Sequence, residues 1–254
     1  GVVFFPEHGS DVGTLLKKAD IAMYAAKKRG RSIYQIYSDS FVTYGLDKQE
    51  MLRDLESAVD RDELVLHYQP KFFTGSNEIC GFEALLRWNR RGQGLVSSDA
   101  FIPLAEESGL LRPIGAWVIW QVCQQISTWR SRGVPFPTEV AVNLSAVQLH
   151  DNDVVTTVEK ALYYYNVEPA ALTLEITETA MIQNISCCLD ILSEFKTMGC
   201  QLSLDDFGTG YSSLSYLSQF PLDELKVDRT FIARSDHDEG SRSIIRAIVA
   251  MAKS

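Results

Sequence analysis

The sequence has few histidines and no cysteine spacing that would hold a metal. Its 254 residues include 4 histidines and 5 cysteines. Cys187 and Cys188 are adjacent, and neither a Cys-x-x-Cys pair nor a Cys/His zinc pattern occurs. An odd number of cysteines without such spacing is typical of reduced thiols, so we expect a cytoplasmic protein without structural zinc.

Long apolar runs and glycine-rich nucleotide loops are also missing. No run of about 18 apolar residues is present, and nothing at Gly1 resembles a signal peptide, so we expect no membrane segment in this chain. Neither Gly-x-Gly-x-x-Gly nor the phosphate-loop pattern appears. This absence argues against an open dinucleotide-binding sheet.

Basic residues are outnumbered by acidic ones. Lys and Arg total 24 against 33 for Asp and Glu, which gives a net charge of -9. A DNA or RNA polymer would find no evident basic surface, so neither is an expected partner. The carboxylates could be spread over the surface, or some could form a divalent-cation site that accepts a small anionic ligand.

Apolar patterning predicts a chain that alternates strands and helices after a first pair of strands. The first part is expected to contain helix 48–59, strands 64–73 and 78–88, and helices 98–108 and 113–132. The expected strand and helix pairs that follow are 139–145 with 154–165, 172–179 with 185–198, 201–206 with 212–219, and 224–231 with 241–253. This alternation predicts a parallel sheet, and the missing dinucleotide motif favours a closed, TIM-like (β/α)8 barrel.

The front of the chain has a different pattern. Residues 1–37 are expected to form a small α/β unit, with a strand at 1–6, a helix that ends before Gly30 and a strand at 32–37. Residues 38–46 have a mixed pattern without a cap and suit a linker. The expected domains are therefore 1–37, the linker 38–46, and the barrel at 47–254.

Charged and amide side chains occur on the expected strands, where a polar residue facing the interior needs a reason. A lone acidic residue at a strand end is usually a helix cap or a surface group, and a lysine there can extend to solvent. Burying several such groups together without a cation would be costly, which favours a shared site at the carboxyl rim of the barrel. The candidates are Glu83, Arg87, Asn143, Glu175, Asp205 and Lys226.

The residue types indicate which cation and which chemistry such a site would have. Carboxylate and amide oxygens suit Mg²⁺ or Mn²⁺ and argue against zinc or copper. Asp206 offers a carboxylate for a second ion about 4 Å from the first, and two such ions can promote phosphodiester hydrolysis. Lys226 would orient or deprotonate the attacking water, and Arg87 would hold a phosphate oxygen. An enolising barrel enzyme would explain the carboxylates equally well, although Asn143 and the Asp205-Asp206 pair favour phosphate chemistry.

Six sequence blocks follow one another along the candidate strands and their loops. They are Tyr-Gln-Pro (68–70), Gly-Phe-Glu-Ala-Leu-Leu-Arg-Trp (81–88), Val-Asn-Leu-Ser (142–145), Leu-Glu-Ile-Thr-Glu (174–178), Asp-Asp-Phe-Gly-Thr-Gly-Tyr (205–211) and Leu-Lys-Val-Asp (225–228). In this order they closely resemble the EAL family of bacterial cyclic di-GMP phosphodiesterases. The resemblance implies a TIM-like barrel that hydrolyses cyclic di-GMP to pGpG with Mg²⁺ or Mn²⁺ in second-messenger signalling. It also implies that Glu83, Asn143, Glu175 and Asp205 are metal ligands and that Asp206 serves a second metal.

The resemblance implies further roles by position. Lys226 matches the lysine that contacts the attacking water, and Arg87 and Gln69 match substrate contacts. Glu178 matches the glutamate that steadies the loop after Asp206. That loop, 207–213, is associated in the family with dimerisation, so a homodimer is expected.

Both ends of the sequence differ from the complete family pattern. Residues 1–37 resemble the tail of a GGDEF (diguanylate cyclase) domain without its Gly-Gly-Asp-Glu-Phe loop, so we expect a remnant that cannot synthesise cyclic di-GMP. The family pattern continues beyond 241–253 with a strand that carries another metal-ligating glutamate. We therefore expect a fragment of a GGDEF–EAL protein, with the barrel truncated after about six strands and poorly active alone.

A non-catalytic cyclic di-GMP receptor of the same fold is the alternative function. Receptor modules of the family tend to have lost ligand residues, whereas every ligand position visible in this sequence is filled.

Overall fold

The structure, a computed structural model, describes residues 1–28, 34–38, 40–134, 139–150, 153–183, 185–208 and 219–252. The chain forms two compact units, Gly1–Ala58 and Val59–Ser254. Within the described part of the chain, no helix is long and apolar enough to cross a membrane.

The described residues of the first unit form two helices and one isolated strand bridge. Helix α1 spans Val12–Lys28 and α2 spans Ser40–Glu56. Where strands were expected at 1–6 and 32–37, a single parallel bridge joins Val2 to Ile36, and residues 29–33 lie outside the described ranges. Residues 40–46, expected within a linker, instead begin α2. The division of the chain at 38–46 stays a prediction.

The second unit is built on one sheet whose strands follow chain order. The strands are β1 (Leu64–Phe72), β2 (Ile79–Arg90), β3 (Gly94–Ser97), β4 (Glu139–Leu144), β5 (Leu172–Thr177), β6 (Gln201–Phe207) and β7 (Glu224–Val227). The sheet order is β1-β2-β4-β5-β6-β7, with β3 paired to β2. β1 pairs antiparallel to β2, and the pairs from β2 to β7 along this path are parallel. The parallel sheet expected from the alternation is confirmed.

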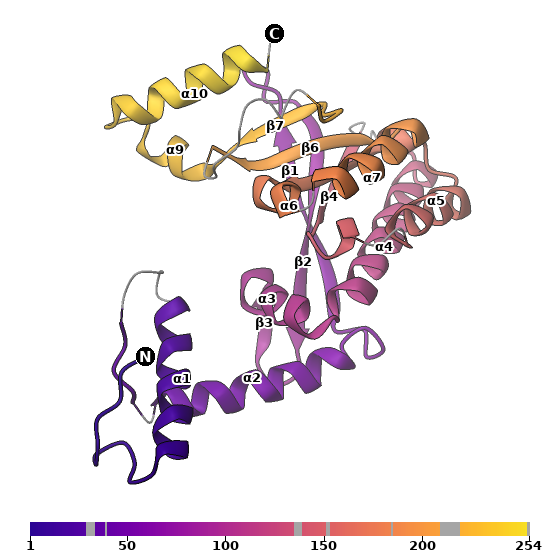
Figure 1. Ribbon diagram of the computed structural model, residues 1–254. Helices are drawn as coiled ribbons and strands as arrows, with labels where there is room; N and C mark the ends of the chain where they lie inside the picture. The colour runs from indigo at the N-terminus through magenta and orange to yellow at the C-terminus, as the bar shows by residue number, and fades with distance from the viewer. Residues whose placement is uncertain are drawn as a thin grey trace. The chain divides into compact units, whose positions relative to one another are not determined.

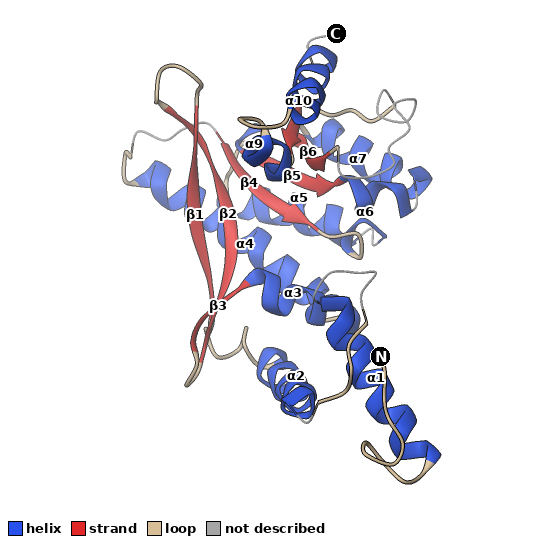
Figure 2. Ribbon diagram, turned by 90° about the vertical axis from the view of Figure 1, so that its left-hand side faces the viewer, coloured by secondary structure: helices blue, strands red, loops and turns tan. Residues whose placement is uncertain are grey.

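Helices follow most strands and cover the sheet (Figures 1 and 2). They are α3 (Ser98–Ser108), α4 (Leu111–Ser131), α5 (Asp153–Tyr165), α6 (Glu178–Gln183), α7 (Ile185–Met198), α9 (Arg229–Arg234) and α10 (Glu239–Met251), with short 3-10 turns η1 (Gln148–His150) and η2 (Pro169–Ala171). The expected helix 212–219 falls almost entirely outside the described residues.

Two predicted elements differ from the structure near the carboxyl ends of strands. The expected strand 224–231 ends at Val227, because Asp228 accepts a hydrogen bond from the Thr230 amide and caps α9. The expected strand 172–179 ends at Thr177, where α6 begins. Each expected strand therefore included the first residues of the helix that follows it.

Alternation along the strands separates an apolar outer face from a polar inner face. Val140, Val142, Leu172, Leu174 and Leu202 are each at most 1% exposed. These side chains form the core beneath the helices, because successive residues of a strand point to opposite faces. The residues between them therefore lie on the inner face of the sheet.

On β2 the outer face packs under helices, as its sequence indicates. Trp88 is fully buried and stacks edge-on against Phe101 of α3, with ring centroids 5.6 Å apart. Phe82 lies against Trp129 of α4, with centroids 5.4 Å apart. Glu83, between these positions, consequently belongs to the inner face.

Candidate functional site

Polar side chains from four neighbouring strands share the inner face of the sheet. Asn143 of β4 is paired in register with Glu175 of β5, and Glu83 of β2 is paired with Ala141, two residues before Asn143. Asp205 of β6 is paired with Thr177, two residues after Glu175. The register therefore brings these candidates to the same end of the sheet.

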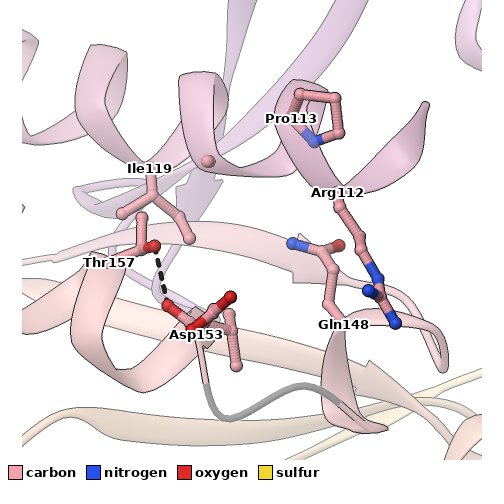
Figure 3. Close-up of a pocket in the computed structure, with 8 residues that line it drawn as sticks. Arg112, Pro113, Ile119, Gln148, Asp153 and Thr157 are labelled. Atoms are coloured by element: carbon pink, nitrogen blue, oxygen red, sulfur yellow. Dashed lines mark hydrogen bonds between the residues drawn. The ribbon is translucent and has the colours of Figure 1, made fainter. Parts of the chain in front are cut away.

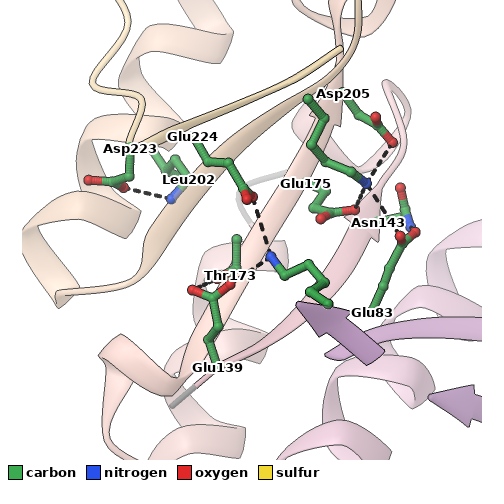
Figure 4. Close-up of polar contacts among 11 residues, drawn as sticks. Glu83, Glu139, Asn143, Thr173, Glu175, Leu202, Asp205, Asp223 and Glu224 are labelled. Carbon is green, nitrogen blue, oxygen red and sulfur yellow. Dashed lines mark hydrogen bonds and ion pairs between the residues drawn. The ribbon is translucent and has the colours of Figure 1, made fainter. Parts of the chain in front are cut away.

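The ammonium of Lys226 lies at the centre of the group (Figure 4). Its Nζ donates hydrogen bonds to Glu175 Oε2 at 2.6 Å, Asp205 Oδ2 at 3.1 Å and Glu83 Oε2 at 3.3 Å. Asn143 Nδ2 donates to Glu83 Oε1 at 2.9 Å. We call Glu83, Asn143, Glu175, Asp205 and Lys226 the carboxylate cluster.

The carboxylate cluster has more negative charge than its one ammonium neutralises. Burial raises the pKa of Glu175 to about 7, although Lys226 acts in the opposite direction. Burial alone would lower the pKa of Lys226, but Glu175, Glu83 and Asp205 hold it above its ordinary 10.5. Lys226 is thus a charged hydrogen-bond donor to three carboxylates in this arrangement.

The donor set fits a divalent cation of the Mg²⁺ and Mn²⁺ class. Oε1 of Glu175 is buried and has no hydrogen-bond partner among the described residues, and the other donor atoms are carboxylate and amide oxygens. Within the same residues, no set of three or more His, Cys, Asp and Glu side chains forms a ready metal site. The central position is held by the Lys226 ammonium, so a metal would have to displace it.

A register shift in β6 separates the two adjacent aspartates. Pairing with β7 shifts between Leu204 and Phe207, and Asp206 has a positive φ of 55°. Asp205 joins the cluster, whereas Asp206 is exposed and its amide donates to Asp205 Oδ1 at 2.9 Å. Burial, followed by the nearby Asp205 carboxylate, raises the pKa of Asp206. Its predicted role at a second metal stays a prediction.

Glu178 supports the backbone where β6 ends. It is 2% exposed, and its Oε2 accepts a hydrogen bond from the Gly208 amide at 3.0 Å. Gly208 has a φ of +100°, and an added Cβ would lie 2.9 Å from the Phe231 ring, so a glycine is needed there. Residues 209–218 lie outside the described ranges, and the dimer expected through the loop 207–213 stays a prediction.

Arg87 and Gln69 lie beside the cluster without bonding to it. Gln69 of β1 is paired in register with Glu83 and is exposed. Arg87 is four residues along β2 from Glu83, about 13 Å at strand spacing, and its Nη1 donates to the Leu86 carbonyl at 2.8 Å. Their predicted substrate contacts stay predictions.

A cavity of about 680 Å³ borders Glu83 and Asn143. Its size is in the range of small-molecule sites. Ile102, Pro103 and Glu106 of α3 line another part of its wall. The sequence offered no indication of these residues, because they occupy ordinary positions of an amphipathic helix.

A smaller cavity of about 320 Å³ lies between α4, η1 and α5 (Figure 3). Arg112, Gln148, Asp153 and Thr157 contribute its polar lining. Gln148 also lines the larger cavity, and its Oε1 accepts from the Ser145 amide at 3.2 Å. Gln148 therefore separates the two cavities.

The chain is similar to known proteins along its whole length. Residues 52–254 match the EAL domain family model. The chain is 40% identical over 253 residues to the cyclic di-GMP phosphodiesterase PdeR of Escherichia coli K12, covering 100% of this chain and 38% of that protein. It is 41% identical over 253 residues to the bifunctional diguanylate cyclase/cyclic di-GMP phosphodiesterase MucR of Pseudomonas aeruginosa, covering 100% and 37%. The chain thus spans less than two fifths of the length of these relatives.

Solved structures show the same fold. The MucR phosphodiesterase in complex with c-di-GMP has a TM-score of 0.77 and 43% identity, covering 80% of this chain and 82% of that one. The EAL enzyme Bd1971 in its cAMP and cyclic-di-GMP bound form has a TM-score of 0.76 and 29% identity, covering 97% and 65%. The second unit therefore has the α/β, TIM-like fold of EAL domains.

Proposed function

The chain belongs to the EAL domain family, and we propose that it carries the catalytic region of a phosphodiesterase that hydrolyses cyclic di-GMP to pGpG. The observation that carries the proposal is the carboxylate cluster, in which Glu83, Glu175 and Asp205 meet Lys226. Because the curated relatives are much longer than this chain, the activity of the protein as a whole is part of the proposal.

Four side chains of the cluster would hold a divalent cation. In this proposal Glu83, Asn143, Glu175 and Asp205 bind one Mg²⁺ or Mn²⁺, and Asp206 serves a second. The buried, unpartnered Oε1 of Glu175 supports this assignment, since a cation would supply its missing partner. Bound there, the ions would neutralise the phosphodiester and lower the pKa of the attacking water.

The remaining residues act on the water and on the nucleotide. Hydrolysis joins the water oxygen to phosphorus and breaks the bond from phosphorus to the ribose 3′ oxygen, which takes a proton. Lys226 orients the water, because its ammonium can donate a hydrogen bond to the water oxygen beside the carboxylates that it contacts. Arg87 would hold a phosphate oxygen of the substrate, and Gln69, paired in register with Glu83, would contact the substrate beside the cluster. Glu178 keeps the Gly208 backbone in place beneath the loop that would mediate a homodimer.

The test is turnover of cyclic di-GMP by the protein at full length, followed by chromatographic separation of pGpG. We expect hydrolysis that requires Mg²⁺ or Mn²⁺ and that falls at least a hundredfold in Asp205→Asn and Lys226→Met, on the scale of lost catalytic groups. Lys196→Met is the matched control, because it removes a lysine ion pair with Asp223 outside the cluster. Undiminished turnover in Asp205→Asn would contradict the assigned roles.

Calorimetry on the same full-length protein distinguishes a non-catalytic receptor from a phosphodiesterase. Calorimetry that shows cyclic di-GMP binding without any metal, together with no turnover, would replace the enzyme by a binding module. Binding that strengthens with Mn²⁺ and is followed by hydrolysis supports the phosphodiesterase.

A further inference from the structure

A second polar cluster lies on the same inner face, with one residue on β1 and the others nearer the amino ends of β4, β5 and β7. Lys71 Nζ is 2.6 Å from Glu139 Oε1 and 3.4 Å from Glu224 Oε2, and Thr173 Oγ1 donates to Glu139 Oε2 at 3.3 Å (Figure 4). We call Lys71, Glu139, Thr173 and Glu224 the lower cluster. None of these residues was singled out in the sequence.

Three residues of the lower cluster lie on the same strands as residues of the carboxylate cluster. Thr173 precedes Glu175 by two positions on β5, and Glu224 precedes Lys226 by two on β7. Residues two apart on a strand face the same side. A displacement of Glu224 along its strand therefore moves Lys226 with it.

A glycine allows the ion pair to form across β2. Lys71 is paired in register with Gly81, which is itself paired with Glu139 on the other side. A Cβ on Gly81 would lie 2.8 Å from Glu139 Cγ and 3.0 Å from the Glu139 carbonyl oxygen. Because Gly81 has no side chain, Lys71 of β1 can reach Glu139 of β4 over the intervening strand.

Few backbone pairs with the neighbouring strand fix the position of β7. It spans only Glu224–Val227, and its pairing with β6 shifts after Leu204. Outside the inner face, Asp223 is held by the Leu202 amide at 2.8 Å and by Lys196 at 2.7 Å. On the inner face, the contact between Lys71 and Glu224 holds the start of the strand.

We propose that Lys71 is a positioning residue. Through its contact with Glu224, it fixes the position of β7 along the strand direction so that the Lys226 ammonium reaches the carboxylates of the cluster. The catalytic consequence rests on the proposed function, whereas the consequence for Lys226 itself does not. Without Lys71, Glu139 and Glu224 are two partly buried carboxylates without the cation that both contact. Their repulsion pushes the start of β7 away from β4.

The kinetic test uses Lys71→Met and Glu224→Gln in the full-length protein. We expect kcat to fall about tenfold to a hundredfold, as for a misplaced catalytic group, while KM for cyclic di-GMP stays within about twofold. Mn²⁺ binding should be retained, because β7 supplies none of the proposed metal ligands. Lys71→Arg should restore most of kcat, since it keeps the cation. A loss of Mn²⁺ binding equal to the loss of kcat would instead indicate general disruption and overturn the proposal.

A spectroscopic test follows Lys226 directly and needs no turnover. In the ¹⁵N-labelled protein, the Lys226 ammonium resonance is identified by its disappearance in Lys226→Met. We expect this resonance to shift or broaden in both Lys71→Met and Glu224→Gln, and to stay in place in the control Lys160→Met, which removes an exposed lysine of α5. An unchanged Lys226 resonance in the two variants would refute the proposal.

Together, the kinetic and spectroscopic tests distinguish failure of the proposed function from failure of the proposed role of Lys71. If the wild-type protein hydrolyses no cyclic di-GMP, the proposed function fails and the Lys226 resonance still decides the role of Lys71. If Lys71→Met does not fold, Glu224→Gln decides, because it removes the charge that pairs with Lys71 while it preserves the shape of the side chain. Normal turnover together with an unmoved resonance in Glu224→Gln would overturn the role of Lys71 alone.

Discussion

Replacing Lys226 by methionine tests whether its ammonium is the counter-ion of the carboxylate cluster in the metal-free protein. The substitution keeps most of the length of the side chain but leaves the carboxylates of Glu83, Glu175 and Asp205 without the cation that all three contact. We expect Lys226→Met to be less stable than the wild type in EDTA, and Mn²⁺ to stabilise it more than it stabilises the wild type.

The structure sets the size of this effect. One pair at the 3.1 Å separation between Lys226 and Asp205 is worth about 5 kcal/mol at an effective dielectric constant of about 20, before desolvation is subtracted. Breaking a buried pair typically costs about 3–5 kcal/mol. The Glu83 and Asp205 side chains are 20% and 22% exposed, so we take the lower end, about 3 kcal/mol. For a chain of this size, that loss lowers the melting temperature by about 6–12 °C.

The assay is thermal unfolding of the wild type, Lys226→Met and Lys196→Met, each with EDTA and with Mn²⁺. Lys196→Met removes a partly exposed ion pair with Asp223, and its loss should stay below about 1 kcal/mol. Equal melting temperatures of wild type and Lys226→Met in EDTA would refute the counter-ion role. A failure of Mn²⁺ to stabilise either protein would refute the cation site.

Three further substitutions test the local structure. Gly208→Ala should lower the free energy of unfolding by about 1–2 kcal/mol in urea denaturation, because Gly208 has a positive φ and its neighbour Phe231 leaves no room for a Cβ; an unchanged stability would contradict this. Trp88→Ala should cost about 3–5 kcal/mol in the same assay, since Trp88 is fully buried and its indole donates to Glu63. Asp238→Asn should lower the melting temperature at neutral pH, because hydrogen bonds from Ser241 and Gly240 hold the pKa of Asp238 below its ordinary 3.8. That stabilisation is present above pH 3.8 and is lost as the pH falls through the lowered pKa, so a difference that persists in strong acid would contradict it.

Most of the fold could be predicted from the alternation of residue types along the strands. Val-Ala-Val-Asn-Leu, Leu-Thr-Leu-Glu-Ile and Leu-Ser-Leu-Asp alternate apolar and polar residues, and the structure places the apolar ones at the core of the sheet. Helices 98–108 and 185–198 begin and end where they were predicted. The prediction was wrong after Val227, because the expected strand continued to Phe231 whereas Asp228 caps a helix there.

The sequence predicts which site residues share a face of the sheet. It does not predict the contacts that depend on the register between neighbouring strands. Glu83, Glu175 and Asp205 could be grouped from the sequence because each lies on a separate expected strand with one face inward. The central place of Lys226 and the pairing of Lys71 with Glu139 depend on how far each strand slides past its neighbours, which the alternation leaves undetermined. The α3 wall of the larger cavity likewise depends on tertiary packing.

The most direct test of the proposed phosphodiesterase is hydrolysis of cyclic di-GMP in water enriched in ¹⁸O, with the product mass measured. We expect pGpG with one ¹⁸O atom in its terminal phosphate, formed with Mg²⁺ or Mn²⁺ and absent with EDTA or in Glu175→Gln. Recovery of all the cyclic di-GMP unlabelled, from a protein that binds it equally well with and without metal, would contradict the proposed phosphodiesterase activity.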